Sequence, residues 1–459
     1  MKEKGLKKVK ELVNGVLIAN TLKTIMSFLS HLSDENLIRL TVLAEKLVAD
    51  ENQKEKVRVV RKKFENHHPS LEASKRISQR LSYQSRQKIV KNLFAYGMFL
   101  GTRKRNEILA KEGFRPPFFL VISPTMRCNL NCIGCYAGSY IKDAGLSTLT
   151  IDRIFQEAKE LGIYFITISG GEPFIKKDLL DLFEKHNDMY FQVYTNGTLI
   201  NEEVAKRLAK LGNVAPAISV EGFEEQTDAR RGKGVFKKLE EVWKLLIENG
   251  VMFGFSATPT RKNVEILFSD EFIDFIISKG ALFGWYFHYI PIGKSPDVDL
   301  MLLPEQRNWA RERLEILRNT KPIILADFWN DGHLAGGCIA GGRTYLHINA
   351  NGDVEPCVFT HFAIDNIKNK SLKDCINSPL MKAIQKQQPY SKNLMTPCMI
   401  IDEPEILRKV VKETGAYSTD GGDKSLLEDL APFLDDYSRK IHQLWDPIWE
   451  EKHKEGKVL

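Results

Sequence analysis

Residues 118–136 read FFLVISPTMRCNLNCIGCY, and this stretch decides how the rest of the chain is interpreted. It opens with an apolar run at residues 118–123 that predicts a buried β-strand. Three cysteines, Cys128, Cys132 and Cys135, follow within eight positions in the loop after that strand. Barrels of parallel strands place their chemistry in loops of this kind. We therefore expect a functional site here.

The spacing of these cysteines leaves two kinds of metal site open. Thiolates separated by three and two residues can bind three irons of a [4Fe–4S] cube and leave the fourth iron without a protein ligand. Zinc is the alternative, although structural zinc sites normally use two close pairs of ligands. The chain has 7 cysteines, an odd number for a disulfide framework. A cluster of thiols in a reducing compartment indicates metal or redox chemistry instead.

Downstream of the cysteines, short β-rich runs alternate with amphipathic helices, which is typical of parallel βαβ units. The alternation predicts an α/β fold, a partial (β/α)6 TIM-like barrel over residues 118–303. The expected strands are 118–123, 164–169, 190–194, 214–220, 252–257 and 282–290, and the expected helices are 151–161, 177–186, 202–211, 236–249 and 269–279.

Two regions flank the predicted barrel. Apolar residues at helical spacing predict an N-terminal helical region over residues 1–117, which Pro116 and Pro117 end. Beyond residue 304 the alternation is expected to stop. A helix at 305–319 and a hairpin around Asn351-Gly352 predict a small C-terminal α+β module over residues 304–405. Residues 406–459 are expected to form a helical tail.

Polar motifs stand where the second, third and fourth predicted strands end. Gly170-Gly171-Glu172-Pro173 combines glycines, which allow close backbone approach, with a carboxylate that suits an ammonium group. Asn196 follows the third strand and Ser219 ends the fourth. The alternative is that such residues only cap the helices that follow them. Because these motifs occur in order on successive strands, a shared site is the better interpretation.

The cysteine motif resembles the signature of the radical S-adenosylmethionine (SAM) superfamily. The resemblance implies that a [4Fe–4S] cluster held by Cys128, Cys132 and Cys135 reductively cleaves SAM to a 5′-deoxyadenosyl radical, which abstracts hydrogen from a substrate. One departure is visible, because the family often has an aromatic residue where this chain has Gly134. The resemblance also implies a set of SAM contacts, which comprises Tyr136, Gly170, Gly171, Glu172, Pro173, Asn196 and Ser219.

The C-terminal module resembles a reduced form of the SPASM or twitch extension, whose cysteines bind an auxiliary iron–sulfur cluster. Cys338, Gly352 and Cys357 match the opening of that pattern. The resemblance makes Cys338, Cys357 and Cys398 the candidate ligands, with structural thiols as the alternative. Cys375 falls in a predicted amphipathic helix at 371–386, where a buried free cysteine is common.

Two further features keep two interpretations each. Arg230 and Arg231 follow the fourth strand and could bind a carboxylate or phosphate, or face solvent. His288, on the sixth predicted strand, could face the barrel lumen and act on substrate, or simply fill space there.

Charge and hydropathy restrict the partners. The net charge is +7, and residues 1–117 carry 25 Lys and Arg against 12 Asp and Glu. The basic segment with Lys7, Lys8 and Lys10 beside Leu12 could contact anionic lipid peripherally, or present a solvated helix face. No apolar run of about 18 residues predicts a membrane span, and the N-terminus does not match an export signal. We expect a cytoplasmic protein.

We therefore expect an enzyme that performs radical chemistry on a peptide or protein, supplied with electrons by a donor such as flavodoxin or ferredoxin. A lipid or isoprenoid substrate is the alternative within that class. A structural metal-binding or nucleic-acid-binding protein is the alternative outside it, and we do not expect a nucleic-acid partner. Because a radical demands a dry cavity, we further expect the N-terminal helices and the C-terminal module to cover the barrel mouth.

Overall fold

The structure is a computed structural model that describes residues 33–47, 51–142, 145–421 and 425–454. Its centre is a nine-stranded sheet with the order β7-β6-β5-β4-β3-β2-β1-β8-β9. Every neighbouring pair from β7 through β1 to β8 is parallel, and only β8 and β9 are antiparallel. The strands are β1 (Phe119–Ile122), β2 (Phe165–Ile168), β3 (Tyr190–Thr195), β4 (Val214–Ser219), β5 (Gly254–Ala257), β6 (Phe283–Tyr286), β7 (Ile324–Asp327), β8 (His347–Ile348) and β9 (Val354–Glu355).

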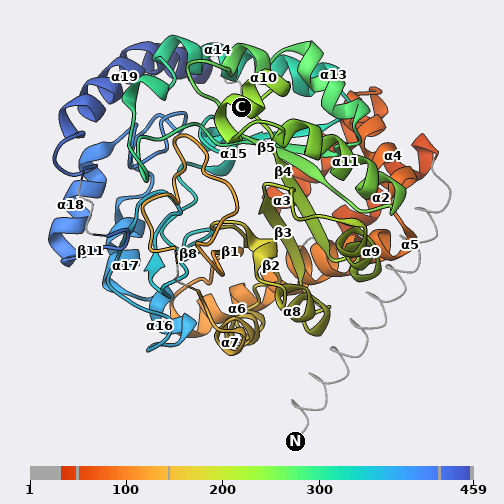
Figure 1. The fold of residues 1–459 in the computed structure, drawn as a ribbon, viewed down its shortest axis with the longest axis horizontal. Helices are drawn as coiled ribbons and strands as arrows, with labels where there is room; N and C mark the ends of the chain where they lie inside the picture. The colour runs from red at the N-terminus through yellow and green to blue at the C-terminus, as the bar shows by residue number, and fades with distance from the viewer. Residues whose placement is uncertain (1–32, 48–50, 143–144, 422–424, 455–459) are drawn as a thin grey trace, which may run out of the picture.

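Helices follow the strands in turn and cover the outer face of the sheet (Figure 1). These helices are α7 (Thr148–Glu160), η2 (Pro173–Ile175), α8 (Leu179–Lys185), α9 (Glu202–Leu211), α10 (Glu224–Arg231), α11 (Val235–Glu248), α12 (Val264–Leu267), α13 (Asp270–Ser278), η3 (Val298–Leu300) and α14 (Pro304–Thr320). The crossovers between parallel strands require such helices. The fold class predicted from the sequence is therefore confirmed.

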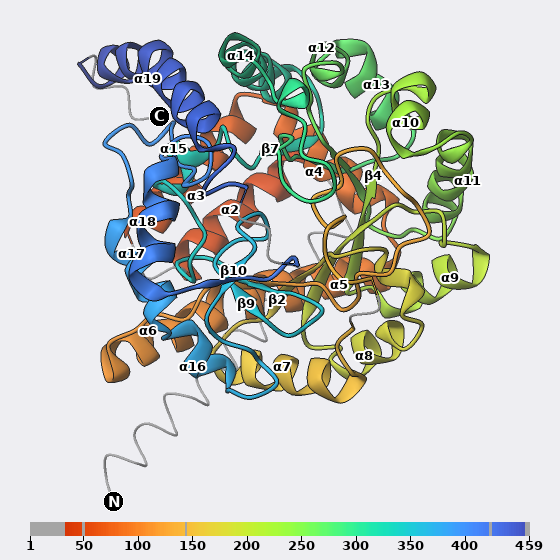
Figure 2. The same cartoon turned by 60° about the vertical axis from the view of Figure 1, so that its left-hand side comes forward.

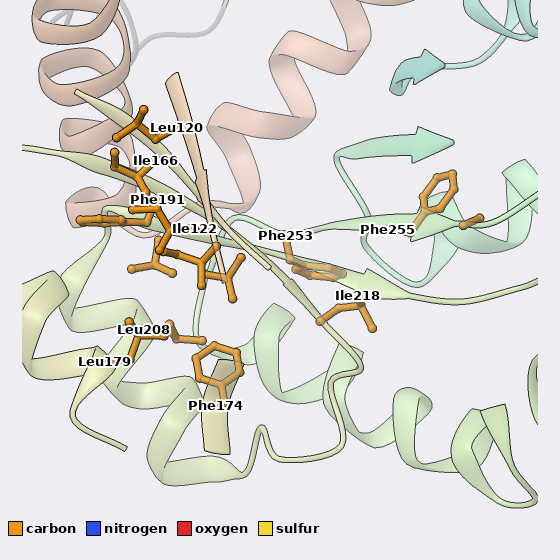
Figure 3. Packing of buried hydrophobic residues seen from close by; sticks show 14 of the residues in the cluster. Leu120, Ile122, Ile166, Phe174, Leu179, Phe191, Leu208, Ile218, Phe253 and Phe255 are labelled. Carbon is orange, nitrogen blue, oxygen red and sulfur yellow. The ribbon is translucent and has the colours of Figure 1, made fainter. Parts of the chain in front are cut away.

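The sheet is curled into a partial barrel. Tyr194 on β3 meets Phe287, just beyond β6, with ring centroids 5.2 Å apart. Two strands separate them in the sheet order, so their rings meet only because the sheet bends towards its inner face. On the outer face, alternate strand residues such as Leu120, Ile122 and Ile166 pack against the helices (Figure 3). Period-two alternation of this kind is what gives each strand one face for each layer.

The alternation continues one unit further than expected. Residues 324–327 form β7, which pairs in parallel with β6, so the prediction that the pattern stops at residue 304 was wrong. Four residues after Pro322 are too short a run to be identified as a strand by periodicity alone. The hairpin predicted around Asn351-Gly352 is present as β8 and β9, and β8 extends the barrel sheet by pairing with β1.

The C-terminal residues wrap the side of the barrel next to β1, where their helices complete the outer arc (Figure 1). The helix predicted at 371–386 is interrupted, because Pro379 starts a new helix after the Ser378 N-cap. The remaining C-terminal elements are α15 (Gly332–Ala335), β10 (Phe362–Ala363), α16 (Leu372–Ile376), α17 (Pro379–Gln387), α18 (Pro404–Thr414), β11 (Tyr417–Ser418) and α19 (Ala431–Lys454).

The N-terminal helices, coloured red to orange in Figures 1 and 2, pack against the end of the barrel at which the strands begin. The cysteines follow the opposite end of β1. Arg76 donates hydrogen bonds to the carbonyls of Pro322 and Ala281, which precede β7 and β6. Asn92 donates to the carbonyls of Asn187 and Met189, which precede β3. The helices are α2 (Asp34–Leu47), α3 (Glu51–Glu65), α4 (Pro69–Arg80), α5 (Tyr83–Lys88), the π-helix η1 (Ile89–Leu100) and α6 (Gly101–Glu112).

The expectation that these helices cover the barrel mouth was therefore wrong. The physical reason is an apolar patch where the inner face of the sheet begins. Tyr190, Ala215 and Ala217 lie there, and Leu81 and Ile89 from the helices bury them. The C-terminal residues do reach the mouth, as expected, because Tyr136 contacts Phe359.

No helix among the described residues is long and apolar enough to cross a membrane. The basic segment with Lys7, Lys8 and Lys10 lies outside those residues.

We expect Asn92→Ala to destabilise the protein by about 1–3 kcal/mol, because the change removes two hydrogen bonds that the buried amide donates, to the carbonyls of Asn187 and Met189. Asn92 is fully buried, with 0% exposure. Urea denaturation monitored by circular dichroism measures the loss. Lys111→Ala, at an exposed position on α6, is the matched control and should change stability by less than about 0.5 kcal/mol. Equal stability of the two variants would show that the hydrogen bonds of Asn92 do not stabilise the protein.

Candidate active site

The three clustered cysteines lie on the loop that leaves β1, named here the cysteine loop (residues 123–136). The backbone N–H of Leu130 donates to the Cys128 Sγ, 3.5 Å away. Burial raises the pKa of the Cys128 thiol, and the neighbouring Cys132 and Cys135 act in the same direction. Cys128 thus lies within electrostatic reach of the other two cysteines. The loop lies at the carboxyl end of β1, where the sequence predicted a site.

The surroundings of Gly134 explain why this chain lacks the aromatic residue that the family often has at this position. Its φ is +63°, and a Cβ there would lie 2.5 Å from the Tyr289 ring. The space that a side chain would need is therefore filled by another aromatic residue. Tyr136 turns towards β2, where its hydroxyl lies 2.6 Å from the Ser169 Oγ. Burial raises the pKa of Tyr136 to about 12, so the hydroxyl stays protonated at neutral pH.

The glycine motif runs directly beside the cysteine loop. The backbone N–H groups of Gly171 and Glu172 donate to the carbonyls of Thr125 and Arg127, at 2.9 and 2.8 Å. A Cβ on Gly171 would lie 2.1 Å from the Arg127 carbonyl oxygen, and one on Gly170 would lie 2.5 Å from that of Thr125. Only glycine permits this approach of two backbones. Pro173 follows as the first residue of η2.

Glu172 takes part in a set of buried hydrogen bonds at the ends of two strands. Its carboxylate is fully buried and accepts hydrogen bonds from the Asn196 backbone N–H (2.7 Å), the Thr195 hydroxyl (2.8 Å) and the Phe174 backbone N–H (3.0 Å). Burial raises the pKa of this carboxyl. Glu172 therefore joins the end of β2 to the end of β3.

Asn196 and Ser219 lie at the ends of their strands, as predicted. The Asn196 side-chain amide donates to Asn129 Oδ1 at 2.9 Å and lies 3.8 Å from the Cys128 Sγ. The Ser219 hydroxyl lies 3.3 Å from the Ser256 hydroxyl, which brings the ends of β4 and β5 together. The structure thus brings Asn196 into direct contact with the cysteine loop.

A buried charge cluster beside the loop was only partly anticipated. Glu221 is fully buried and forms ion pairs with both Arg230 and Arg231. Arg231 also interacts electrostatically with Cys132 and Cys135. The arginines therefore bind a carboxylate, as one interpretation had it, but the carboxylate is their own Glu221. The signal available in the sequence was the spacing of nine and ten residues between this acid and the two bases.

A second group of cysteines lines a cavity of about 250 Å³, named here the cysteine cavity. Cys338, Cys357 and Cys398 all lie on its wall, together with the mostly apolar side chains Trp285, Ala326, Phe328, Trp329, Leu334, Ile339, Pro397, Met399 and Ile400. These three cysteines are far apart in the sequence. The structure thus brings the predicted auxiliary ligands together around one space.

Burial raises the pKa of all three thiols, that of Cys398 to about 12. The Tyr345 hydroxyl donates to the Cys357 Sγ at 2.9 Å. Cys375 is absent from the cavity wall and packs instead in the core between the sheet and its helices. That position agrees with its interpretation as a core residue.

The donor sets fit iron–sulfur clusters in both places. Thiolates are the ligands of such clusters, and each binds a different iron, so the sulfurs surround a space. A single ion needs side chains that converge on one point, and the described residues hold no such group of three His, Cys, Asp or Glu side chains.

Aromatic rings connect the two cysteine groups. The ring centroid of Phe359 lies 5.4 Å from that of Tyr136 and 4.9 Å from that of Trp329. Trp329 lines the cysteine cavity. Phe287 lies 5.4 Å from Phe328 and packs on Trp285. This aromatic cluster was not predicted, although the alternating aromatic residues at positions 285, 287 and 289 are a signal that the sequence contains. His288 stacks on Trp329, with ring centroids 5.7 Å apart, and its Nε2 lies 2.9 Å from Asp327 Oδ2.

Comparisons with known proteins agree with this geometry. A model of the radical SAM superfamily matches residues 122–258, and a model of the iron–sulfur cluster-binding domain SPASM matches residues 338–399. Mycofactocin maturase MftC of Mycobacterium tuberculosis is 32% identical over 275 residues, covering 56% of this chain and 69% of the relative. PqqA peptide cyclase of Granulibacter bethesdensis is 26% identical over 318 residues, covering 63% of this chain and 81% of the relative.

Among solved structures, Streptococcus suis SuiB bound to SAM matches with a TM-score of 0.56 and 21% identity, covering 71% of this chain and 81% of that one. This likeness concerns the fold. The first matched domain implies a [4Fe–4S] cluster and SAM, and the second implies auxiliary iron–sulfur clusters.

Gly171→Ala should weaken SAM binding to the reconstituted protein by at least about tenfold, because the methyl group would push the cysteine loop away from the glycine motif. Equilibrium binding of SAM without oxygen measures the effect. Gly145→Ala is the control, since the nearest atom to a Cβ there is 3.7 Å away. Equal affinities of the two variants would show that the close backbone approach does not matter.

Proposed function

The chain belongs to the radical SAM superfamily, and from that membership we propose that it is an enzyme that modifies a peptide. The superfamily and the SPASM-like extension were both predicted from the sequence and are confirmed. The observation that carries the proposal is the combination of two cysteine sites in one chain. One faces the glycine motif at the barrel mouth, and the other lines the cysteine cavity.

In this proposal Cys128, Cys132 and Cys135 hold the [4Fe–4S] cluster that binds SAM. When bound and reduced, the cluster and SAM supply the 5′-deoxyadenosyl radical that takes hydrogen from the substrate. The contacts we assign to SAM are Tyr136, Gly170, Gly171, Glu172, Pro173, Asn196 and Ser219. Glu172 also accepts the buried hydrogen bond that holds Asn196 beside the cysteine loop.

The chain's own residues supply binding, orientation and exclusion of water. The backbone carbonyl groups of a glycine pair suit an ammonium group such as that of methionine. Asn196 and the Glu221–arginine cluster hold the cysteine loop from two sides. Tyr136, Phe287 and Phe359 present apolar rings where a radical needs protection from water.

We propose that Cys338, Cys357 and Cys398 hold one auxiliary cluster. The apolar wall of the cysteine cavity excludes water from it. The two relatives act, by their names, on mycofactocin and on the PqqA peptide. The likeness to these relatives, together with the matches to both domain families, favours a peptide substrate here. The lipid alternative depended on the segment of residues 7–17, which lies outside the described residues.

An electron donor is needed to reduce the cluster, and we propose that the donor docks on the cysteine loop. Ile133, directly after Cys132, is 59% exposed and marks the side from which flavodoxin or ferredoxin would approach. Such carriers and free thiols agree with a cytoplasmic location. Peripheral membrane contact remains a prediction from the sequence.

The reaction is tested by reconstituting the protein without oxygen, reducing it with dithionite and adding SAM. We expect formation of 5′-deoxyadenosine by the intact protein and by Cys375→Ala, and none by the variant in which Cys128, Cys132 and Cys135 are all alanine. The triple variant should retain iron in the cysteine cavity, and further replacement of Cys338, Cys357 and Cys398 should remove it.

Two results would overturn the proposal. Equal amounts of 5′-deoxyadenosine from the intact protein and the triple variant would exclude the cysteine loop as the reactive site. Residual iron near zero in the triple variant would exclude the auxiliary cluster.

A further inference from the structure

A buried ion pair stands beside the cysteine cavity and has no part in the function proposed so far. Arg307 on α14 binds Asp402 through two hydrogen bonds, at 2.5 and 3.2 Å. Both side chains are fully buried. The Trp445 ring of α19 lies 4.5 Å from the guanidinium group. A fully desolvated pair of this kind is costly to build, so its position next to a metal-binding cavity requires an explanation.

Asp402 connects the pair to one of the cysteines. The backbone N–H of Cys398 donates to Asp402 Oδ2 at 3.0 Å, and the backbone N–H of Asp402 donates to the Cys398 carbonyl at 3.0 Å. These reciprocal bonds hold the turn on which the Cys398 thiol is mounted. The carboxylate of Asp402 therefore lies within one turn of a sulfur on the cavity wall.

Arg307 connects the pair to the barrel. Its Nε donates to Asn330 Oδ1 at 3.1 Å, and the Asn330 amide donates to Asp327 Oδ2 at 2.9 Å. Asp327 ends β7, lines the cavity and pairs with His288. A continuous chain of buried hydrogen bonds thus runs from the end of the sheet to Cys398. Its groups have fixed positions, because each is held by at least one partner on another element.

We propose that Arg307 and Asp402 are positioning residues that set the reduction potential of the auxiliary cluster, with effects of opposite sign. This inference rests on the proposed function, which places a cluster on Cys338, Cys357 and Cys398. Reduction adds one negative charge to the cluster. Fixed charges act strongly on that step because the surroundings are apolar and poorly screened. The positive guanidinium favours the reduced state, and the carboxylate disfavours it.

The two single variants are therefore expected to shift the potential in opposite directions. Arg307→Met removes a positive charge and leaves Asp402 unpaired, so the potential should fall. Asp402→Asn removes a negative charge and keeps a side chain of similar shape, so the potential should rise. The double variant should return towards the parent value. Arg307→Lys keeps the charge and should stay close to the parent, even though a lysine cannot reproduce the two-pronged contact.

The experiment uses the full-length chain in which Cys128, Cys132 and Cys135 are alanine, so that any iron–sulfur signal comes from the auxiliary cluster. Each variant is reconstituted without oxygen, its iron is counted, and its electron paramagnetic resonance signal is followed through a redox titration. Arg313→Met is the matched control. Arg313 lies on the same helix and pairs with Asp270 at 2.7 Å, but that pair is partly exposed and should not affect the potential.

The outcomes separate the two proposals. Absence of iron from the cysteine-loop variant itself would overturn the proposed function. Iron present in that parent, with potentials that shift in the same direction in Arg307→Met and Asp402→Asn or do not shift, would overturn the inference. If Arg307→Met loses its cluster, Asp402→Asn and Arg307→Lys decide. A raised potential in the first and an unchanged potential in the second support it, and any other pair of results rejects it.

Discussion

The close approach of two backbone segments at the barrel mouth is the constraint on which the site depends. Residues 170–172 run beside residues 125–127 with carbonyl-to-amide hydrogen bonds of 2.8–2.9 Å, and glycine is required at both 170 and 171. This contact joins the end of β2 to the cysteine loop. Glu172 extends it to the end of β3 through Asn196, which in turn reaches Asn129 and Cys128. One glycine pair thus determines the positions of three strand ends.

The sequence was sufficient for the features that depend on local pattern. The first five barrel strands lie within about two residues of their predicted ranges, since each combines apolar residues with a following turn signal. The cysteine loop and the glycine motif were also identified, because their spacing reflects chemistry that few other sequences need. The contacts that these residues make were harder to predict from the sequence. The buried hydrogen bonds that Glu172 accepts from Thr195 and Asn196 are an example, because only the three-dimensional arrangement reveals them.

Features that depend on long-range packing were not predictable. The strand β8 is two residues long, and its pairing with β1 joins residues more than 200 positions apart. The N-terminal helices have ordinary amphipathic sequences, so nothing in them indicated which end of the barrel they cover. Their position follows from the apolar patch around Tyr190 and Ala217. The pairing of Arg307 with Asp402 is likewise invisible in the sequence, because 95 residues separate the two charges.

The central claim is that this chain holds two separate iron–sulfur clusters. Crystals of the anaerobically reconstituted protein, measured at the iron absorption edge, test it most directly. We expect two anomalous peaks from iron, one beside Cys128, Cys132 and Cys135 and one within the cysteine cavity. A single peak, or a second peak away from Cys338, Cys357 and Cys398, would contradict it.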